Sequence, residues 1–142
     1  MTLEIRILQA GEAWVLDQVA DDVFDRPVDP RWSAEFLADP RHHLVVAIDD
    51  GIVVGMASGV HYIHPDKPPQ LFINEVGVAS SHQSRGIGRR MLDALLERGR
   101  ALGCSEAWVL TDESNSIARK LYAGAGGEID SEPAIMYTFP FS

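Results

Sequence analysis

The stretch that decides the fold runs from Val76 to Arg90 and reads VGVASSHQSRGIGRR. Its first residues predict the end of a β-strand, and Gly86 and Gly88 stand one residue apart where a helical pattern begins. Glycine lets a ligand approach the backbone closely, and a helix start leaves N–H groups unpaired with a partial positive charge. These features together predict a pyrophosphate site. The alternative is a glycine-rich turn that only joins a strand to a helix, because neither the three-glycine dinucleotide fingerprint nor the NTPase loop is present.

The rest of the chain alternates between strand-like and helical patterns. Strands are predicted at residues 4–8, 43–48, 52–60, 71–78, 106–111 and 134–139. Helices are predicted over 11–24 and 31–38, after the glycine pair as far as Gly103, and between a cap at Ser114 or Asn115 and Gly126-Gly127. Antiparallel hairpins come first and strand–helix–strand crossovers follow. This order predicts an α+β sandwich around one central sheet.

Length and composition are those of a single globular domain over residues 1–142. The chain is 46% hydrophobic and 23% charged, which excludes a disordered or fibrous protein. No apolar run is long enough to span a membrane, and the first residues lack a signal-peptide pattern. With Cys104 as the single cysteine, these features favour a cytoplasmic location.

Three further groups of side chains outside the glycine stretch are expected to be structural. His61-x-x-His64 lacks further ligands, so we expect no metal site. A half-buried thiol is expected for Cys104. The three tryptophans, Trp14, Trp32 and Trp108, are expected in the core, and Trp32 could alternatively help to wall a substrate pocket.

Charge is unevenly distributed along the chain. The net charge is −9, which argues against nucleic acid or anionic lipid as a partner and favours a cation. Residues 12–29 hold six acids and one arginine, whereas residues 80–100 hold five arginines and two acids. This asymmetry suggests two ligands of opposite sign. Solvated helix faces are the alternative explanation.

Two motifs resemble the signature of the GNAT superfamily of N-acetyltransferases. Gln83-x-x-Gly86-x-Gly88 follows a Val-x-Val strand, as in the acetyl-CoA motif of that family, and Asn115-x-x-Ala118-x-x-x-Tyr122 lies at the next strand–helix junction. The resemblance covers essentially the whole chain. It implies the GNAT fold, with a central mixed, mostly antiparallel sheet flanked by helices on both faces. It also implies acetyl-CoA as the co-substrate.

The resemblance assigns roles to individual residues. Glu75 would take the proton of the amine, directly or through water, the Val78 N–H would bind the thioester oxygen, and Tyr122 would protonate the leaving thiolate. Transfer would be direct, with no acyl-enzyme. An ion pair for Glu75 and a core position for Tyr122 remain the structural alternatives. The implied acetyl-CoA contacts are Val76, Val78, Gln83, Ser84, Arg85, Gly86, Ile87, Gly88, Arg89, Asn115, Ala118 and Tyr122.

Carboxylates in the segments that line the acceptor pocket of this fold suggest a polycationic amine. The expected substrate-binding residues are Asp25, Asp29, Glu75, Asp112 and Glu113. The chain looks similar to the aminoglycoside 3-N-acetyltransferases of the superfamily, which suggests the 3-amino group of an aminoglycoside. Those enzymes more often carry Asp where Glu75 stands, so the geometry of the base stays open.

Other functions fit the same motifs. A GNAT enzyme could acetylate a protein or peptide amine, or the amine of a small metabolite. An acyl-CoA sensor would bind the donor without turnover. The family also admits a homodimer, for which the sequence shows no self-evident interface.

Overall fold

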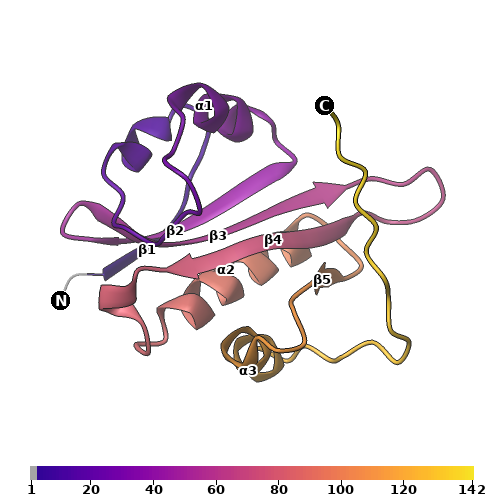
Figure 1. The fold of residues 1–142 in the computed structure, drawn as a ribbon. Helices are drawn as coiled ribbons and strands as arrows, with labels where there is room; N and C mark the ends of the chain where they lie inside the picture. The colour runs from indigo at the N-terminus through magenta and orange to yellow at the C-terminus, as the bar shows by residue number, and fades with distance from the viewer. Residues whose placement is uncertain (1–2) are drawn as a thin grey trace.

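A computed structural model describes residues 3–142 and contains one five-stranded sheet (Figure 1). The strand order is β1-β2-β3-β4-β5. The first four strands pair antiparallel, and β5 pairs parallel with β4. The predicted mixed, mostly antiparallel sheet is therefore confirmed. The strands are β1 Leu3–Ile7, β2 His42–Asp49, β3 Ile52–Tyr62, β4 Gln70–Val78 and β5 Ala107–Val109.

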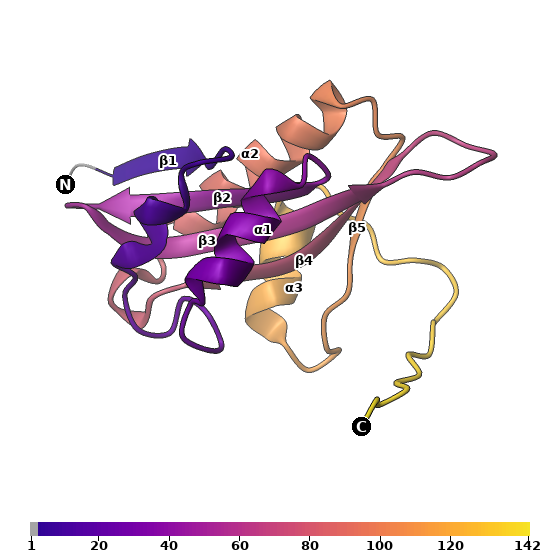
Figure 2. The same ribbon diagram turned by 90° about the horizontal axis from the view of Figure 1, so that it is seen from above.

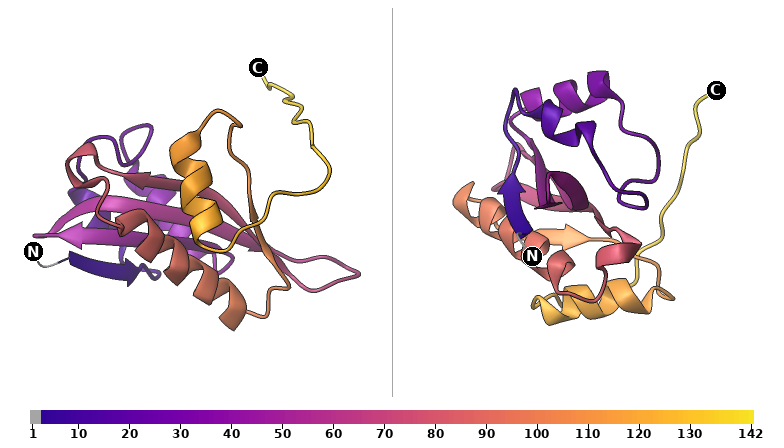
Figure 3. Two further views of the ribbon diagram at one scale, coloured as in Figure 1. Left: turned by 90° about the horizontal axis from the view of Figure 1, so that it is seen from below. Right: turned by 90° about the vertical axis from the view of Figure 1, so that its left-hand side faces the viewer.

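Helices cover both faces of this sheet, as the α+β prediction requires (Figures 2 and 3). The short 3-10 helix η1 (Ala13–Asp17) and α1 (Pro30–Ala38) lie on one face. The opposite face carries α2 (Ile87–Ala101) and α3 (Ser116–Gly124), and a second 3-10 turn, η2 (Ser80–His82), precedes α2. Of the helices in residues 3–142, none combines the length and the apolar character that a bilayer crossing needs.

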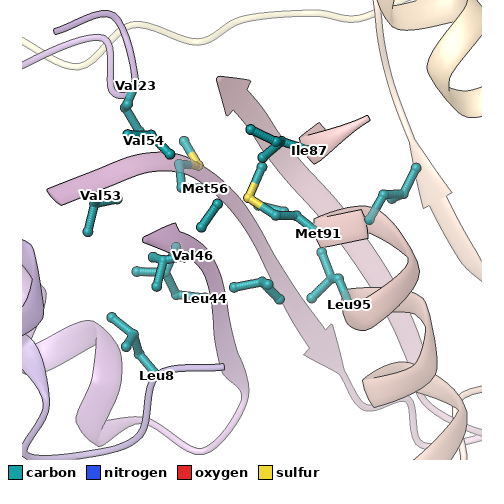
Figure 4. Close-up of a cluster of buried hydrophobic side chains, with 14 of the residues drawn as sticks. Leu8, Val23, Leu44, Val46, Val53, Val54, Met56, Ile87, Met91 and Leu95 are labelled. Atoms are coloured by element: carbon teal, nitrogen blue, oxygen red, sulfur yellow. The ribbon is translucent and has the colours of Figure 1, made fainter. Parts of the chain in front are cut away.

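The core holds α2 firmly against the middle of the sheet (Figure 4). Ile87, Met91 and Leu95 of α2 are fully buried. A Cβ atom at Gly55 of β3 would lie 2.9 Å from the Met91 Cε atom, so the helix packs directly on the strand backbone. Burial of each large apolar side chain contributes about 1.5–3 kcal/mol. This packing fixes the start of α2 beside the end of β4.

The prediction of a helix over residues 11–24 is wrong beyond the first turn. Only η1 forms, and Val19 then makes a parallel β-bridge with Val53 of β3. The Val53 N–H donates to Gln18 and the Ala20 N–H donates to Val53, so pairing with the sheet replaces helical hydrogen bonds. Asp22, at φ 67°, adopts a left-handed conformation that a helix cannot contain.

Two other predicted elements differ from the structure. The predicted strand at 106–111 shortens to β5, and residues 134–139 form no strand. A strand needs a hydrogen-bonding partner, and residues 134–139 have none among residues 3–142.

The three tryptophans are exposed rather than buried in the core. The exposed fractions are 62% for Trp14, 68% for Trp32 and 37% for Trp108. Trp14 lies against the guanidinium of Arg6, and Trp32 occupies the outer face of α1. The Trp108 indole N–H donates to the Tyr62 hydroxyl at 2.9 Å. Indole rings need a partner for their N–H group, and this favours partly solvated positions.

Candidate active site

A bulge in β4 sets the direction of the Glu75 side chain. Ser58 of β3 pairs with Glu75 and the next residue, Gly59, pairs with Ile73, so Asn74 is left without a partner. A β-bulge of this kind bends the strand and changes the direction of the side chains that follow it. Ile73, before the bulge, is buried. Glu75, after it, is exposed and is the only ionisable residue of β4.

The acidic loop, defined as residues 21–26, packs against β4 at Gly77. A Cβ atom at Gly77 would lie only 2.5 Å from the Val23 carbonyl oxygen, so no other residue fits there without moving the loop. The Ser80 hydroxyl, just after β4, donates to Asp22 at 3.1 Å. Because Glu75 stands two residues before Gly77, both lie on the face of β4 that meets the acidic loop. The Val-Gly-Val pattern of β4 is the only sequence signal for this contact.

Glu75 and Asp25 are the two predicted acceptor residues that the structure brings together. Partial burial raises the pKa of the Glu75 carboxyl above 4.5, and the negative charge of Asp25 raises this pKa further. Glu75 keeps contact with solvent on one side. A carboxylate with a raised pKa and an open side can accept a proton from an amine or from a water between them.

The glycine loop, defined as residues 79–86 between β4 and α2, has the geometry of an anion site. Gly86, the residue before α2, has φ 76° and Ser84 has φ 64°, so the backbone turns twice through the left-handed region. The start of α2 has no side-chain cap and no acidic residue in its first turn. The N–H groups at Ile87, Gly88 and Arg89 therefore have no helical partner. A diphosphate would fit this cradle.

Two side chains, one in this loop and one in the first turn of α2, are held by hydrogen bonds to backbone carbonyls. The Gln83 amide donates to the Val78 carbonyl at 3.2 Å, which folds the loop back over the end of β4. The Arg89 guanidinium donates to the Gly124 carbonyl at 2.6 Å and to Asp93 at 3.0 Å. In this structure Arg89 therefore links α2 to α3, and its backbone N–H rather than its guanidinium faces the cradle.

Tyr122 of α3 packs at the edge of the buried core, next in sequence to Leu121. Asn115 caps α3 by accepting from the Ala118 N–H at 3.0 Å, and Leu121 lies beside Gly88 at the start of α2. Tyr122 is half-buried, and this burial raises the pKa of its hydroxyl above 10. The hydroxyl therefore stays protonated at neutral pH, as a proton donor must.

The other predicted acids are not among the charges that raise the pKa of Glu75. Asp29 caps α1 by accepting from the Arg31 N–H at 2.9 Å, and its hydrogen bonds to Arg31 lower its pKa. Asp112 and Glu113 are exposed in the connection between β5 and α3. Within residues 3–142 there is no cluster of three or more His, Cys, Asp or Glu residues that could hold a metal ion.

An aromatic cluster toward the Gln70 end of β4 was not expected from the sequence. The rings of Phe72 and Trp108 lie 4.6 Å apart, and Tyr62 meets Trp108 edge-on at 6.4 Å. Phe72 follows the buried Leu71, which faces Gly99 of α2, so Phe72 lies on the opposite face of the sheet. Only the pairing of β3, β4 and β5 brings these three rings together.

Three relatives align with 62% to 73% of the length of this chain. A diaminobutyric acid acetyltransferase of Virgibacillus pantothenticus is 35% identical over 62% of this chain and 54% of its own length. The N-alpha-acetyltransferase RimI of Mycobacterium tuberculosis is 36% identical over 73% of this chain and 63% of its own. An aminoglycoside N(6')-acetyltransferase of Salmonella typhimurium is 28% identical over 65% of this chain and 66% of its own. The chain thus spans about half to two thirds of the length of these curated relatives.

A solved structure shares the whole fold. It is an aminoglycoside acetyltransferase from an uncultured soil metagenomic sample, with a TM-score of 0.81 over 100% of both chains and 21% sequence identity. The sequence model described as the acetyltransferase (GNAT) family matches residues 11–126. This match includes the acidic loop, β4, the glycine loop and α3, so the chain belongs to the GNAT acetyltransferase family.

Proposed function

We propose that this protein is an acetyl-CoA-dependent N-acetyltransferase that acts on an amine of a small polycation, with an aminoglycoside as the first candidate. The observation that carries the proposal is the position of Glu75. A carboxyl with a raised pKa lies beside Asp25 and the acidic loop, on the strand that ends at the uncapped start of α2. An acceptor cation and a donor diphosphate would therefore meet at one strand end.

The donor would bind along β4, the glycine loop and α3. The backbone N–H groups of Gly86, Ile87, Gly88 and Arg89 would hold the diphosphate, with Gln83, Ser84 and Arg85 around them. Val76, Val78, Asn115, Ala118 and Tyr122 would line the path of the thioester arm. The supporting observations are the two left-handed residues in the loop and the absence of a side-chain cap on α2.

The chemistry is a direct transfer from sulfur to nitrogen. The ammonium of the acceptor loses a proton to Glu75, directly or through one water. The amine nitrogen then attacks the thioester carbonyl carbon, so a C–N bond forms and the C–S bond breaks. The Val78 N–H would stabilise the negative charge that develops on the carbonyl oxygen. Tyr122 would give its proton to the leaving thiolate, and the proton that the nitrogen loses as the amide forms would restore the Tyr122 hydroxyl.

The charges at the acceptor side support a substrate with more than one ammonium group. Asp25 and Glu75 provide two carboxylates at one place, in a chain of net charge −9. The aromatic cluster of Tyr62, Phe72 and Trp108 adds ring faces that attract cations. Of the expected acceptor residues, Asp112 and Glu113 remain candidates for an outer rim, whereas the contacts of Asp29 within α1 leave it a weaker candidate.

A small diamino acid is the second candidate acceptor. The Virgibacillus relative is named for diaminobutyric acid, which carries two amino groups. The Salmonella relative is named for the 6' amine of an aminoglycoside, so the 3-amino group suggested by the sequence stays a prediction. The RimI relative is named an N-alpha-acetyltransferase, which makes a peptide the acceptor to test against both.

The test is release of coenzyme A thiol from acetyl-CoA with a panel of amines. Aminoglycosides are expected to be acetylated, and NMR of the product identifies the amine. Diaminobutyric acid and peptides with a free amino terminus are the competing acceptors. The KM for the polycation should rise with salt, because the Debye length falls from about 10 Å at 0.1 M to about 3 Å at 1 M. Turnover of a neutral or peptide amine alone, or binding of acetyl-CoA with no turnover of any amine, would contradict the proposal.

A further inference from the structure

Three side chains form a hydrogen-bonded line between the turn after β4 and the turn between β2 and β3. The Ser81 Oγ atom lies 2.7 Å from Nδ1 of the His82 imidazole. The other ring nitrogen, Nε2, lies 2.6 Å from the Asp49 carboxylate. Serine, histidine and carboxylate thus follow one another at the distances at which a hydroxyl is activated as a nucleophile.

The carboxylate fixes which nitrogen of the imidazole carries the proton. An ionised Asp49 can only accept hydrogen bonds, so neutral His82 donates its Nε2–H to the carboxylate. Nδ1 is then an acceptor, and the Ser81 hydroxyl donates to it. This is the direction in which the imidazole can take the serine proton as a general base.

The line is shielded at one end and open at the other. The side chains of His82 and Asp49 are largely shielded from solvent, whereas Ser81 is exposed. The neighbouring Ser80 is also exposed, but its hydroxyl donates to Asp22 rather than to an imidazole. Of these two serines, only Ser81 combines a base with an open approach for a substrate.

Two backbone N–H groups of the glycine loop lie close to Ser81 in the chain. Within residues 3–142, no backbone carbonyl accepts a hydrogen bond from the N–H of Gln83 or of Ser84. Ser84 has φ 64°, so the backbone turns sharply here. N–H groups without a backbone partner can stabilise the negative oxygen that forms when a nucleophile attacks a carbonyl group.

We propose that Ser81, His82 and Asp49 form a second reactive site, which hydrolyses small activated carboxylic esters through an acyl-Ser81 intermediate. The Ser81 Oγ atom attacks the ester carbonyl carbon while Nδ1 of His82 takes the hydroxyl proton. The bond to the alcohol oxygen then breaks, and the alcohol leaves with the proton from Nδ1. Water attacks the acyl group and gives a proton to Nδ1, which returns it to Oγ as the carboxylic acid leaves.

The roles within this site differ. Ser81 and His82 contact the reacting atoms, whereas Asp49 is a positioning residue that holds the imidazole in the reactive tautomer. The site is independent of the proposed amine acetylation, because its reaction needs neither acetyl-CoA nor an amine.

The experiment uses p-nitrophenyl acetate as the ester and the whole chain as the enzyme, without acetyl-CoA. Wild-type protein should release p-nitrophenol at least about tenfold faster than Ser81→Ala or His82→Gln, since general base catalysis contributes about 10²–10⁴-fold. Mass spectrometry of peptides from the quenched reaction should find the acetyl group on Ser81. Ser80→Ala is the matched control and should keep the wild-type rate. Ser81 is exposed, so Ser81→Ala should fold, and an unchanged circular dichroism spectrum checks this.

Two changes at Asp49 separate positioning from packing. Asp49→Asn keeps the shape, but its amide can donate to Nε2 and thereby favours the tautomer with the proton on Nδ1, which cannot accept from Ser81. This variant should lose at least about tenfold in the rate of acylation. Asp49→Glu keeps a carboxylate and should recover part of that loss, which a purely structural role for Asp49 does not predict.

Three results would overturn the proposal. Equal rates of p-nitrophenol release from wild-type protein and Ser81→Ala would show that Ser81 is not a nucleophile. An acetyl group on His82, or on Lys67 or Lys120, the two lysines of the chain, with none on Ser81 would assign the reaction to another group. A wild-type rate in Asp49→Asn would show that the carboxylate does not position the base.

Discussion

The His82 Nε2 atom lies 2.6 Å from an Asp49 carboxylate oxygen, across 33 residues of sequence. The contact ties the start of the glycine loop to the turn between β2 and β3. The Ser81 hydroxyl lies 2.7 Å from the other ring nitrogen, so both sides of the imidazole are held. Both side chains of the pair are largely shielded from solvent, at 16% and 21% exposure. The anion cradle therefore has an anchor outside its own motif.

Loss of this anchor should weaken acetyl-CoA binding without touching the cradle itself. We expect His82→Gln and Asp49→Asn each to raise the Kd about three- to tenfold, the equivalent of one hydrogen bond at ~0.5–1.5 kcal/mol. The double variant should lose less binding free energy for acetyl-CoA than the sum of the two single losses, because both changes remove the same contact. Calorimetric titration measures all three. Asp50→Asn, on the exposed neighbour in the same turn, is the control, and additive effects would show that the two residues act separately.

Gly86→Val tests the backbone cradle directly. Gly86 has φ 76° and no atom within 4 Å of a built Cβ, so the change costs conformational strain of about 1–2 kcal/mol without a steric clash. Gly11, at φ 87°, also has open space around it and lies far from the loop in sequence. Gly11→Val should therefore lose similar stability. Only Gly86→Val should weaken acetyl-CoA binding, by about fivefold or more, and equal affinities in the two variants would place the donor elsewhere.

Tyr122→Phe removes the proposed proton donor and keeps the half-buried ring. General acid catalysis contributes about 10²–10⁴-fold, so kcat should fall at least about tenfold. KM should change little, since the lost interaction belongs to the transition state. Steady-state thiol release measures both constants. Tyr137→Phe, on an exposed ring, is the control. Unchanged kcat in Tyr122→Phe would leave Tyr122 with a packing role only.

The acid side of the pH–rate profile should follow the ionisation of Glu75. The base must be deprotonated, so kcat/KM falls as the pH drops through a pKa that burial and Asp25 hold above 4.5. Asp25→Asn removes a negative charge, which lowers the pKa of Glu75. The acid limb of the profile, where kcat/KM falls, should therefore move to lower pH. Glu75→Gln should lower kcat and remove the limb. Asp21→Asn is the control on an exposed acid of the same loop, and an identical shift there would assign the effect to overall charge.

His43 should make the fold sensitive to acid. It is buried, and its Nε2 atom lies 2.7 Å from the His61 Nδ1 atom. Burial, followed by the charges of His61 and Arg98, lowers the pKa of His43 from 6.5 to about 4. The unfolded chain therefore binds a proton more readily than the folded chain. The stability contributed by neutral His43 is complete above pH 6.5 and is lost as the pH falls toward 4, by about 3 kcal/mol in all at ~1.4 kcal/mol per pKa unit.

Urea titrations at several pH values check this dependence. His43→Gln should lower the free energy of unfolding at pH 7 and flatten its dependence between pH 6.5 and 4. His64→Gln, on the loop side of β3, should leave the dependence unchanged. A wild-type unfolding free energy that does not change over this range would show that the histidine pair adapts to protonation without cost.

Local patterns allowed much of the fold to be predicted, including the turns that carry the proposed donor site. Gly86 and Asn115 act through their own turns, so their sequence context is sufficient to locate them. Asp followed by Pro is also a typical sequence for a capped helix start. In the structure Asp29 caps α1 in this way. The predicted helix over 11–24 failed because Val19 found a strand partner at Val53, and no local pattern reports such a contact.

The acceptor side depends on contacts between distant segments. The approach of Val23 to Gly77 joins residues 54 positions apart and becomes visible only once the sheet is assembled. The bulge at Asn74 also arises from pairing between strands, since β4 reads as a regular strand by itself. Residues 134–139 were predicted as a strand from composition, yet a strand pattern does not specify what the strand pairs with.

The hydrogen bond from Ser80 to Asp22 connects the two proposed substrate sites. Ser80 begins the connection that leads to the anion cradle, and Asp22 belongs to the loop that carries Asp25. A cation that drew this loop toward Glu75 would also pull on the connection that we propose as the diphosphate site. We therefore expect positive heterotropic cooperativity between the two substrates, and thermodynamic linkage requires each to tighten the other by the same factor.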